Sequence, residues 1–454
     1  MTAVHVERPT NVGFDAGSAR ATRPTAHGVG TVPGASTYER LRLEVLDALA
    51  KEQVDGRNAA AVTAVVRARV AAYQSRAEGG VVAGLANPGE TAERLVRSLT
   101  GAGPLQKFFD DPSLADEVIV KGGTITFWTR DGRQEVDREP TCEAELTGIA
   151  QRLLSDAGAT VDLENPVVVH QVWDNRVRAS VSIPPVADEL DATFRIYWAR
   201  RTDLADVVEW GSLSPTAANV LGAFMLSPTG VLVTGGPGSG KSTIVSALLR
   251  ATPATVNTRI IQEARELEAP HLPGGRWSPE AGGHSIRSLV RRSLQFAPQL
   301  VVVGETLGEE AFELLKAANA GCGFLSTLHA NSAQLGMQSL VTAALMAGEN
   351  VPERAVRTSF ARLINLVVHC EAEPLHRIEA GGRRRRRVME ICVVPPQISD
   401  DEFVLEPLFR REDFGTPLQF CGHHLPEELE ARLNRALPTG VTIRDLCEGR
   451  ASIL

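Results

Sequence analysis

The chain has 454 residues and a formal net charge of −8, with 43% hydrophobic and 22% charged residues. These values are ordinary for a soluble globular protein of about two or three domains. The acidic balance and the 5% aromatic content disfavour a protein whose main task is to coat nucleic acid. The six cysteines form no CxxC pair, which disfavours a zinc ribbon or a thioredoxin-type site.

The N-terminal part of the chain changes character near residue 37. Residues 1–36 are rich in Ala, Gly, Thr, Pro and Val without apolar periodicity, which predicts a disordered tail. A helical extension is expected over 37–90. Thr37 is a candidate N-cap, and a second helix is predicted over 59–76. The first helix has apolar residues at helical spacing, namely Leu41, Val45, Leu46 and Leu49.

Residues 91–203 mix strand and helix signals, which predicts an α+β N-terminal domain. Turn residues and β-branched runs predict strands at 118–120, 124–129, 167–170 and 177–183, with a helix at 147–154.

Residues 204–454 read as an α/β domain in which buried strands alternate with helices. Strands are predicted at 231–233, 259–261, 300–303 and 324–328, and helices at 242–250, 285–295 and 309–320. Continuous apolar strands indicate a parallel sheet covered on both faces. Two further strands, 366–368 and 388–394, are expected to pair. The run Arg383 to Arg387 between them is either a solvated hairpin tip or a patch for acidic partners or lipid headgroups.

The strongest chemical signal is Gly235-Gly236-Pro237-Gly238-Ser239-Gly240-Lys241-Ser242, which fits G-x-x-x-x-G-K-[ST] in full. Such a loop between a strand and a helix turns its N–H groups toward phosphate oxygens. Lys241 is expected to reach the β- and γ-phosphates, and Ser242 to ligate Mg²⁺. We therefore predict that this segment and the following Thr243 bind ATP with Mg²⁺.

Three other polar segments follow predicted strands. Glu305 ends the strand at 300–303 and is expected to polarise the attacking water or to help hold Mg²⁺. His329 follows the strand at 324–328 and is either a sensor near the γ-phosphate or a structural histidine. Glu263 and Glu266 follow the strand at 259–261, where they bind metal or water or form the first turn of a solvated helix.

These elements, in this order, resemble the secretion-system ATPase superfamily of type II and type IV secretion and pilus assembly. The resemblance spans about residues 91–411 and is greatest to the CpaF-type tight-adherence pilus branch. It implies a RecA-like P-loop domain preceded by a smaller α+β domain. It also matches Arg195 to an interdomain arginine that contacts nucleotide, with a surface salt bridge as the alternative.

The resemblance implies a hexameric motor that hydrolyses ATP at the cytoplasmic face of the membrane, where it powers pilus assembly or protein secretion. Its partners would be its own copies and polytopic inner-membrane platform proteins. We expect a cytoplasmic chain without a signal peptide, attached to the membrane through partners.

The sequence departs from this family where charge matters most. After the strand at 259–261 the family usually carries a Glu-Asp pair, and here those positions read Gln262-Glu263. Just before the strand at 300–303 the family has arginines and an Arg-Pro-Asp step, whereas this chain has Gln295, Ala297 and Gln299. Arginines near a transferring phosphoryl group can be worth about 10³-fold or more in rate. One alternative is therefore a nucleotide-binding ring subunit with weak or no hydrolysis. Another is an ATPase for DNA transport, although direct nucleic-acid binding is disfavoured by the charge.

Overall fold

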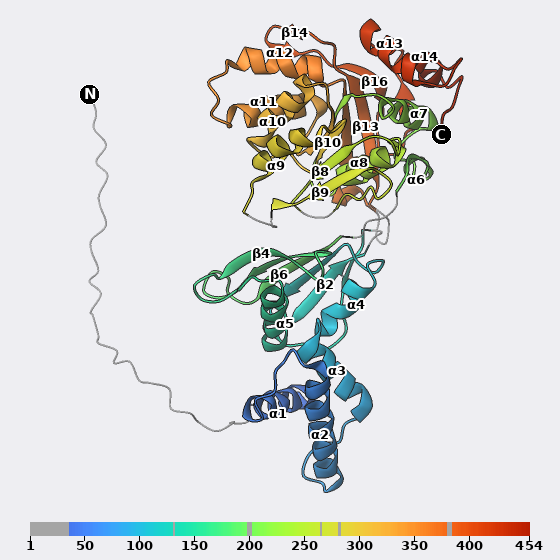
Figure 1. Cartoon of the computed structure of the whole chain (residues 1–454). Helices are drawn as coiled ribbons and strands as arrows, with labels where there is room; N and C mark the ends of the chain where they lie inside the picture. Colours follow the sequence, from blue (N-terminus) through green and yellow to red (C-terminus); the bar gives the residue numbers. More distant parts are fainter. Residues whose placement is uncertain (1–35, 130–131, 198–201, 264–265, 280–282, 379–383) are drawn as a thin grey trace, which may run out of the picture. The chain divides into compact units, whose positions relative to one another are not determined.

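The computed structural model describes residues 36–129, 132–197, 202–263, 266–279, 283–378 and 384–454 (Figure 1). Contacts divide the chain into two compact units, Met1–Leu95 and Val96–Leu454. The predicted disordered tail lies outside the described residues except for Ser36, so its prediction is not tested.

The first unit is helical. It contains α1 (Thr37–Lys51), α2 (Ala59–Glu78) and the beginning of α3 (Pro88–Thr100). The N-cap of α1 is Ser36, whose side chain accepts a hydrogen bond from Glu39 N, so the expected cap at Thr37 was wrong by one residue. Leu41 and Val45 are fully buried, whereas Leu46 is 37% exposed and lies outside the apolar stripe. No described helix is long and apolar enough to cross a membrane.

The second unit begins with an antiparallel six-stranded sheet in the order β3-β2-β1-β6-β5-β4. Its strands are β1 (Glu117–Lys121), β2 (Thr124–Trp128), β3 (Gln134–Val136), β4 (Val167–Val172), β5 (Val177–Ser182) and β6 (Asp191–Ile196). The helices α4 (Gln106–Asp110) and α5 (Glu143–Asp156) contribute to one core with it, in which Phe108, Ile149 and Phe194 are buried.

A nine-stranded sheet carries the glycine-rich segment, in the order β17-β16-β13-β12-β7-β11-β10-β8-β9. The strands from β12 to β9 in this order are parallel, while β13, β16 and β17 are antiparallel to their neighbours. The bounds are β7 (Gly230–Gly235), β8 (Thr258–Ile261), β9 (Gly274–Trp277), β10 (Leu300–Val303), β11 (Gly323–Leu328), β12 (Leu366–Ala372), β13 (Arg386–Val393), β16 (Glu406–Arg410) and β17 (Gln419–Phe420). Strands β14 (Ile398–Ser399) and β15 (Glu402–Phe403) form a separate pair.

Helices cover both faces of this sheet (Figure 1). They are α6 (Leu204–Glu209), α7 (Pro215–Phe224), α8 (Lys241–Ala251), α9 (Ile286–Ser293), α10 (Glu310–Asn319), α11 (Ala333–Leu345), α12 (Glu353–Leu363), α13 (Glu427–Ala436) and α14 (Ile443–Cys447). Alternate residues of β7 enter different cores. Val231 packs with α7 and α8, and Leu232 packs with α10, α11 and α12. The predicted α/β fold, with a largely parallel sheet preceded by a smaller α+β part, is confirmed.

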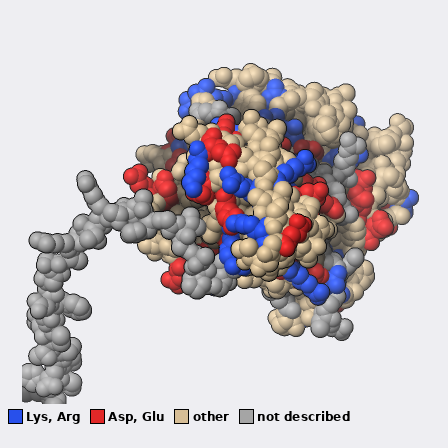
Figure 2. Space-filling view, turned by 90° about the horizontal axis from the view of Figure 1, so that it is seen from below, with Lys and Arg blue, Asp and Glu red and all other residues tan. Residues whose placement is uncertain are grey.

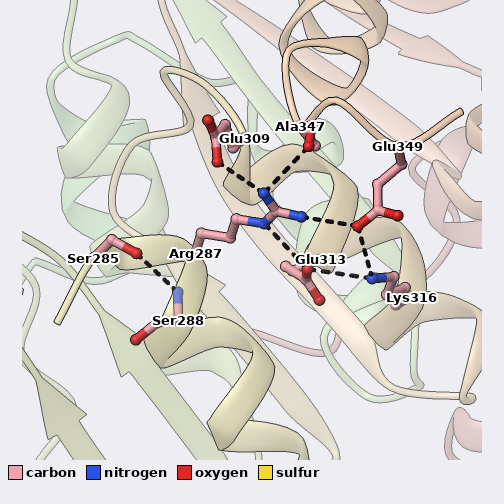
Figure 3. Close-up of polar contacts among 8 residues, drawn as sticks. All are labelled: Ser285, Arg287, Ser288, Glu309, Glu313, Lys316, Ala347 and Glu349. Carbon is pink, nitrogen blue, oxygen red and sulfur yellow. Dashed lines mark hydrogen bonds and ion pairs between the residues drawn. The ribbon is translucent and has the colours of Figure 1, made fainter.

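A cluster of charges ties α9 and α10 to the segment after α11 (Figure 3). Arg287 donates from Nη1 to Glu309 Oε2 at 2.8 Å and from Nη2 to Glu349 Oε1 at 3.0 Å. Its Nε donates at 3.3 Å to Oε1 of Glu313, whose side chain is only 1% exposed. Lys316 donates to the same oxygen at 3.3 Å. The buried carboxylate is therefore paired by two cations.

Candidate functional site

The glycine-rich segment lies between the end of β7 and the start of α8, as the pattern predicts. Gly235 has φ of 150°, and a Cβ there would lie 2.2 Å from Cys370 O. Gly240 has φ of 98°, a conformation that residues with a side chain rarely adopt. A Cβ on Gly236 or Gly238 would meet nothing within 4 Å, so the loop borders open space. These glycines allow a bare backbone loop at the N-terminus of a helix, which suits an anionic ligand.

Lys241 lies within this loop and is only 8% exposed. Its Nζ donates to the carbonyl oxygens of Gly235 and Gly236, both at 3.0 Å. Burial lowers the pKa of Lys241, because it disfavours the charged ammonium, while Glu305 acts in the opposite direction. The ammonium is thus held next to the loop carbonyls at a cost in solvation, which the approach of an anion would offset.

His329 connects this lysine to the carboxylate at the end of β10. Its Nδ1 lies 3.1 Å from Lys241 Nζ, and its Nε2 lies 2.7 Å from Glu305 Oε1. Because an ammonium can only donate, Nδ1 accepts from Lys241, which leaves the ring proton of a neutral imidazole on Nε2. The structure therefore brings together three of the predicted catalytic side chains.

Two other predicted residues meet at the start of α8. Ser242 Oγ donates to Glu266 Oε2 at 2.6 Å. No group of three or more His, Cys, Asp or Glu side chains able to hold a metal occurs among the described residues. Mg²⁺ is commonly held by one or two protein oxygens together with substrate phosphates and water. Ser242 and the nearby Glu266 fit that mode, and the metal would neutralise phosphate charge there.

Ser239 supplies a further sign that the loop fits a polar ligand. Its side chain is 3% exposed, and its Oγ has no hydrogen-bond partner within the described segments. A buried hydroxyl without a partner is costly, so a ligand oxygen reaching it would remove that cost.

The altered acidic pair has a structural explanation. The Gln262 side-chain oxygen accepts from the backbone N–H groups of Glu266 and Leu267 at 3.1 and 2.9 Å. Its Nε2 donates to Leu267 O at 3.1 Å. Only an amide can both accept and donate here, because a carboxylate lacks the donor. The neighbouring Glu263 is exposed, and no contact joins its carboxylate to the other candidate residues that the structure describes.

The segment after β10 is fixed by contacts that the sequence did not indicate. A Cβ on Gly304 would lie 2.8 Å from Gln262 Cβ, so this position requires glycine. Thr306 is buried, and its Oγ1 lies 2.7 Å from Ser326 Oγ of β11. Thr327 Oγ1 donates to Gly304 O at 2.5 Å. These hydroxyls anchor the residues on either side of Glu305, and their proximity depends on the pairing of β10 with β11.

A buried histidine on the strand next to β7 was also missed. His369 Nδ1 lies 2.9 Å from Thr234 Oγ1, and its Nε2 lies 3.3 Å from Glu371 Oε1. Burial lowers the pKa of His369, while Glu371 acts in the opposite direction. The only available signal was a polar residue within the apolar run of β12.

Arg195 lies on β6 with an exposed side chain. Its guanidinium carbon lies 5.9 Å from the centroid of the Tyr197 ring. Its positive charge is one of the smaller causes that lower the pKa of Lys241. The charge of Arg195 therefore acts on the loop, but no hydrogen bond or ion pair joins Arg195 to a described residue of the loop.

Over its described part the arginine run is solvent-accessible, with Arg385 and Arg386 exposed and Arg384 and Arg387 half-buried, yet its side chains also make specific contacts. Arg383 lies outside the described residues. Arg385 binds Glu373 through Nε at 2.9 Å and through Nη2 at 2.5 Å, which holds the pKa of Glu373 below its ordinary value. Arg386 and Arg387 belong to β13. Arg387 donates to Trp210 O at 2.9 Å, and Arg386 Nη2 lies 3.4 Å from Asp116 Oδ2.

Several known proteins are similar to this chain in sequence or in structure. The family of type II/IV secretion system proteins matches residues 166–400. A Mycobacterium tuberculosis protein whose name assigns it to conjugal transfer is 30% identical over 315 residues, covering 66% of this chain and 86% of that protein. The type IV secretion system protein PtlH of Bordetella pertussis is 34% identical over 174 residues, covering 36% of this chain and 49% of PtlH. The solved structure of the Legionella pneumophila ATPase DotB is 20% identical with a TM-score of 0.47, covering 62% of this chain and 77% of DotB.

Proposed function

Since the chain belongs to the family of type II/IV secretion system proteins, we propose that it is a P-loop ATPase that hydrolyses ATP with Mg²⁺. The observation that carries this proposal is the contact series from Lys241 through His329 to Glu305 beside the glycine-rich loop. In this proposal residues 235–243 bind the nucleotide, and Lys241 neutralises phosphate charge. Glu305, oriented by His329, positions and polarises the attacking water.

Several finer assignments belong to the same proposal. Arg195 would contact the nucleotide, Ser242 would ligate the metal, and Glu266 would hold that hydroxyl or a metal-bound water. Glu305 is also proposed as a second metal ligand, although its carboxylate lies against His329. Glu263 is proposed as a catalytic group, although its side chain is exposed. The division into 37–90, 91–203 and 204–454 is likewise proposed.

At the level of the assembly, we propose a homohexameric motor of the CpaF-type branch. It would act on a polytopic inner-membrane platform at the cytoplasmic face of the membrane and assemble a pilus or drive secretion. The support is the family match together with the sequence resemblance over residues 91–411.

Two observations keep other functions in view. Gln262 is occupied by backbone hydrogen bonds and supplies no acid, which favours a ring subunit with slow turnover. A 30%-identical relative carries a name that assigns it to conjugal transfer, which favours DNA transport. However, acidic and basic side chains are interspersed on the face shown in Figure 2, which gives little support for direct DNA contact there.

The deciding experiment measures ATP hydrolysis across separated oligomer fractions of the full chain. We expect Mg²⁺-dependent turnover that rises with oligomer formation and is lost in Lys241→Ala and after chelation of Mg²⁺. Glu305→Gln should lower kcat by about 100-fold or more while nucleotide still binds. Tight binding with a turnover that Glu305→Gln leaves unchanged would favour the slow ring subunit. Turnover indifferent to Lys241→Ala would refute the ATPase assignment.

A further inference from the structure

Arg386 occupies the edge of the large sheet at which the glycine-rich loop begins. It is the first residue of β13 and pairs with Ala372 of the antiparallel β12. Strand β12 in turn runs parallel to β7, with Cys370 opposite Gly235. The start of β13 therefore lies on the same side as the carboxyl ends of β7 and β12, where ligands of such sheets bind.

The stem of Arg386 packs against the residue that precedes Lys241. A Cβ built on Gly240 would lie 3.8 Å from Arg386 Cβ and 4.0 Å from its Cδ. Gly240 is the N-cap of α8, so the stem runs beside the positive end of that helix. This contact places a guanidinium within side-chain reach of the loop.

The described arginines of the run differ in how firmly their guanidinium groups are held. Arg385 is bound at two points by the buried carboxylate of Glu373. Arg387 donates to the carbonyl of Trp210. Arg386 is paired with Asp116 by one 3.4 Å contact, and its side chain is 46% exposed. A single exposed ion pair of this length is weak in water, so this guanidinium can exchange partners readily.

We propose that Arg386 is a phosphate-binding residue that this chain supplies to its own nucleotide site. When a nucleotide enters the loop, the guanidinium leaves Asp116 and binds the polyphosphate oxygens. Arginine suits this task because its planar fork of N–H donors matches phosphate oxygens at two points. The inference rests on the proposed function, since it requires that the loop bind a nucleotide.

The test measures the Kd of fluorescent N-methylanthraniloyl-ADP with Mg²⁺ for the full chain and four variants. Arg386→Ala should raise Kd about 10- to 100-fold, the loss expected for a charge-assisted hydrogen bond. Arg386→Lys should recover only part, because an ammonium cannot make the two-point contact. Asp116→Asn should lower Kd by roughly threefold, because it removes the carboxylate that competes with the phosphates for the Arg386 guanidinium.

Arg410→Ala is the matched control. Arg410 lies on β16 and makes one exposed 3.5 Å ion pair with Glu390, and its side chain is 58% exposed. We expect it to change Kd by less than about twofold. An Arg386→Ala protein whose Kd matches that of the control would overturn the inference. If Arg386→Ala fails to fold, the Asp116→Asn variant decides. A Kd of Asp116→Asn that equals or exceeds that of the wild type would then overturn the inference.

The outcomes separate this inference from the proposed function. If the wild type binds the nucleotide without hydrolysing ATP, the ATPase proposal fails, yet the Kd comparison still decides the role of Arg386. If the wild type hydrolyses ATP while Arg386→Ala binds nucleotide normally, only the inference fails.

Discussion

Nε2 of His329 lies 2.7 Å from Oε1 of Glu305, and this contact joins the polar segments that follow β11 and β10. The two side chains are 42% and 36% exposed, so the pair is open to solvent and to a ligand. The other ring nitrogen of His329 faces Lys241. The His329 ring thus lies between the Glu305 carboxylate and the ammonium of Lys241 in the glycine-rich loop.

His329→Ala should therefore lower kcat for ATP hydrolysis by about 10- to 100-fold, since an unoriented carboxylate places water poorly. Nucleotide affinity should change by less than about threefold, because Lys241 and the loop remain. Steady-state kinetics measure the change in kcat, and a separate binding titration measures the change in nucleotide affinity. The exposed His376 provides the control substitution, which should leave both quantities near the wild-type values. A loss confined to affinity would contradict the orienting role.

Gln262→Glu tests whether the altered acidic pair is a structural adaptation. The substitution keeps the acceptor but removes the donor to Leu267 O, and it buries a carboxylate at a position that is 4% exposed. We expect a loss of about 1–3 kcal/mol in the free energy of unfolding, measured by urea denaturation. Gln299→Glu is the control, because exposed Gln299 also accepts from a backbone N–H, that of Asn257. A stable Gln262→Glu protein with faster hydrolysis would show that the site lacks an acid.

Arg287→Ala should lower the free energy of unfolding by about 2–4 kcal/mol, because it leaves the buried Glu313 carboxylate with Lys316 alone. The variant also removes the contacts of Arg287 with Glu309 and Glu349, which leaves Glu349 with Lys316 at 3.9 Å (Figure 3). Chemical denaturation measures the change. Arg276→Ala removes one exposed ion pair with Glu268 and should cost less than about 1 kcal/mol. Equal losses in the two variants would mean that the cluster adds nothing beyond a surface pair.

The pairing of Arg385 with Glu373 should make stability depend on acidity. Hydrogen bonds from Arg385 lower the pKa of Glu373 from its ordinary value of 4.5. A carboxyl whose folded-state pKa is depressed stabilises the fold fully above the ordinary pKa and loses that contribution as pH falls through the depressed value. The stability gap between wild type and Glu373→Gln should thus be largest near neutral pH and shrink below about pH 4.5.

Urea unfolding of both proteins across this pH range measures that gap. The exposed Glu412 offers the control substitution Glu412→Gln. A gap that stays constant down to the lowest pH at which the protein folds would contradict the role of the pair.

Local patterns were sufficient for a large part of the fold and of the site. The spacing of glycines before Lys241 requires a loop between a strand and a helix, because only glycine adopts the φ of Gly240 at little cost. The apolar run before Glu305 predicts a buried strand, and β10 forms there. The family resemblance is confirmed as well, whereas the CpaF-type branch, the domain boundaries and the residue roles stay predictions.

Other features could not be derived from local patterns. Gln262 looked like a lost acid until its side chain was seen bound to the backbone at Glu266 and Leu267. The arginine run is exposed as expected, but the sequence did not indicate that Arg385 binds the buried carboxylate of Glu373 or that Arg386 packs beside Gly240.

The sequence by itself determined that a glycine-rich loop joins a strand to a helix and which strand ends carry polar residues, because those signals depend on neighbours within a few positions. Only the tertiary structure decided which side chains meet. The order β13-β12-β7-β11-β10 places Arg386, Lys241, His329 and Glu305 along one edge of the sheet. The order of strands depends on the packing of the whole domain, so residues far apart in the chain become neighbours without any local mark in the sequence.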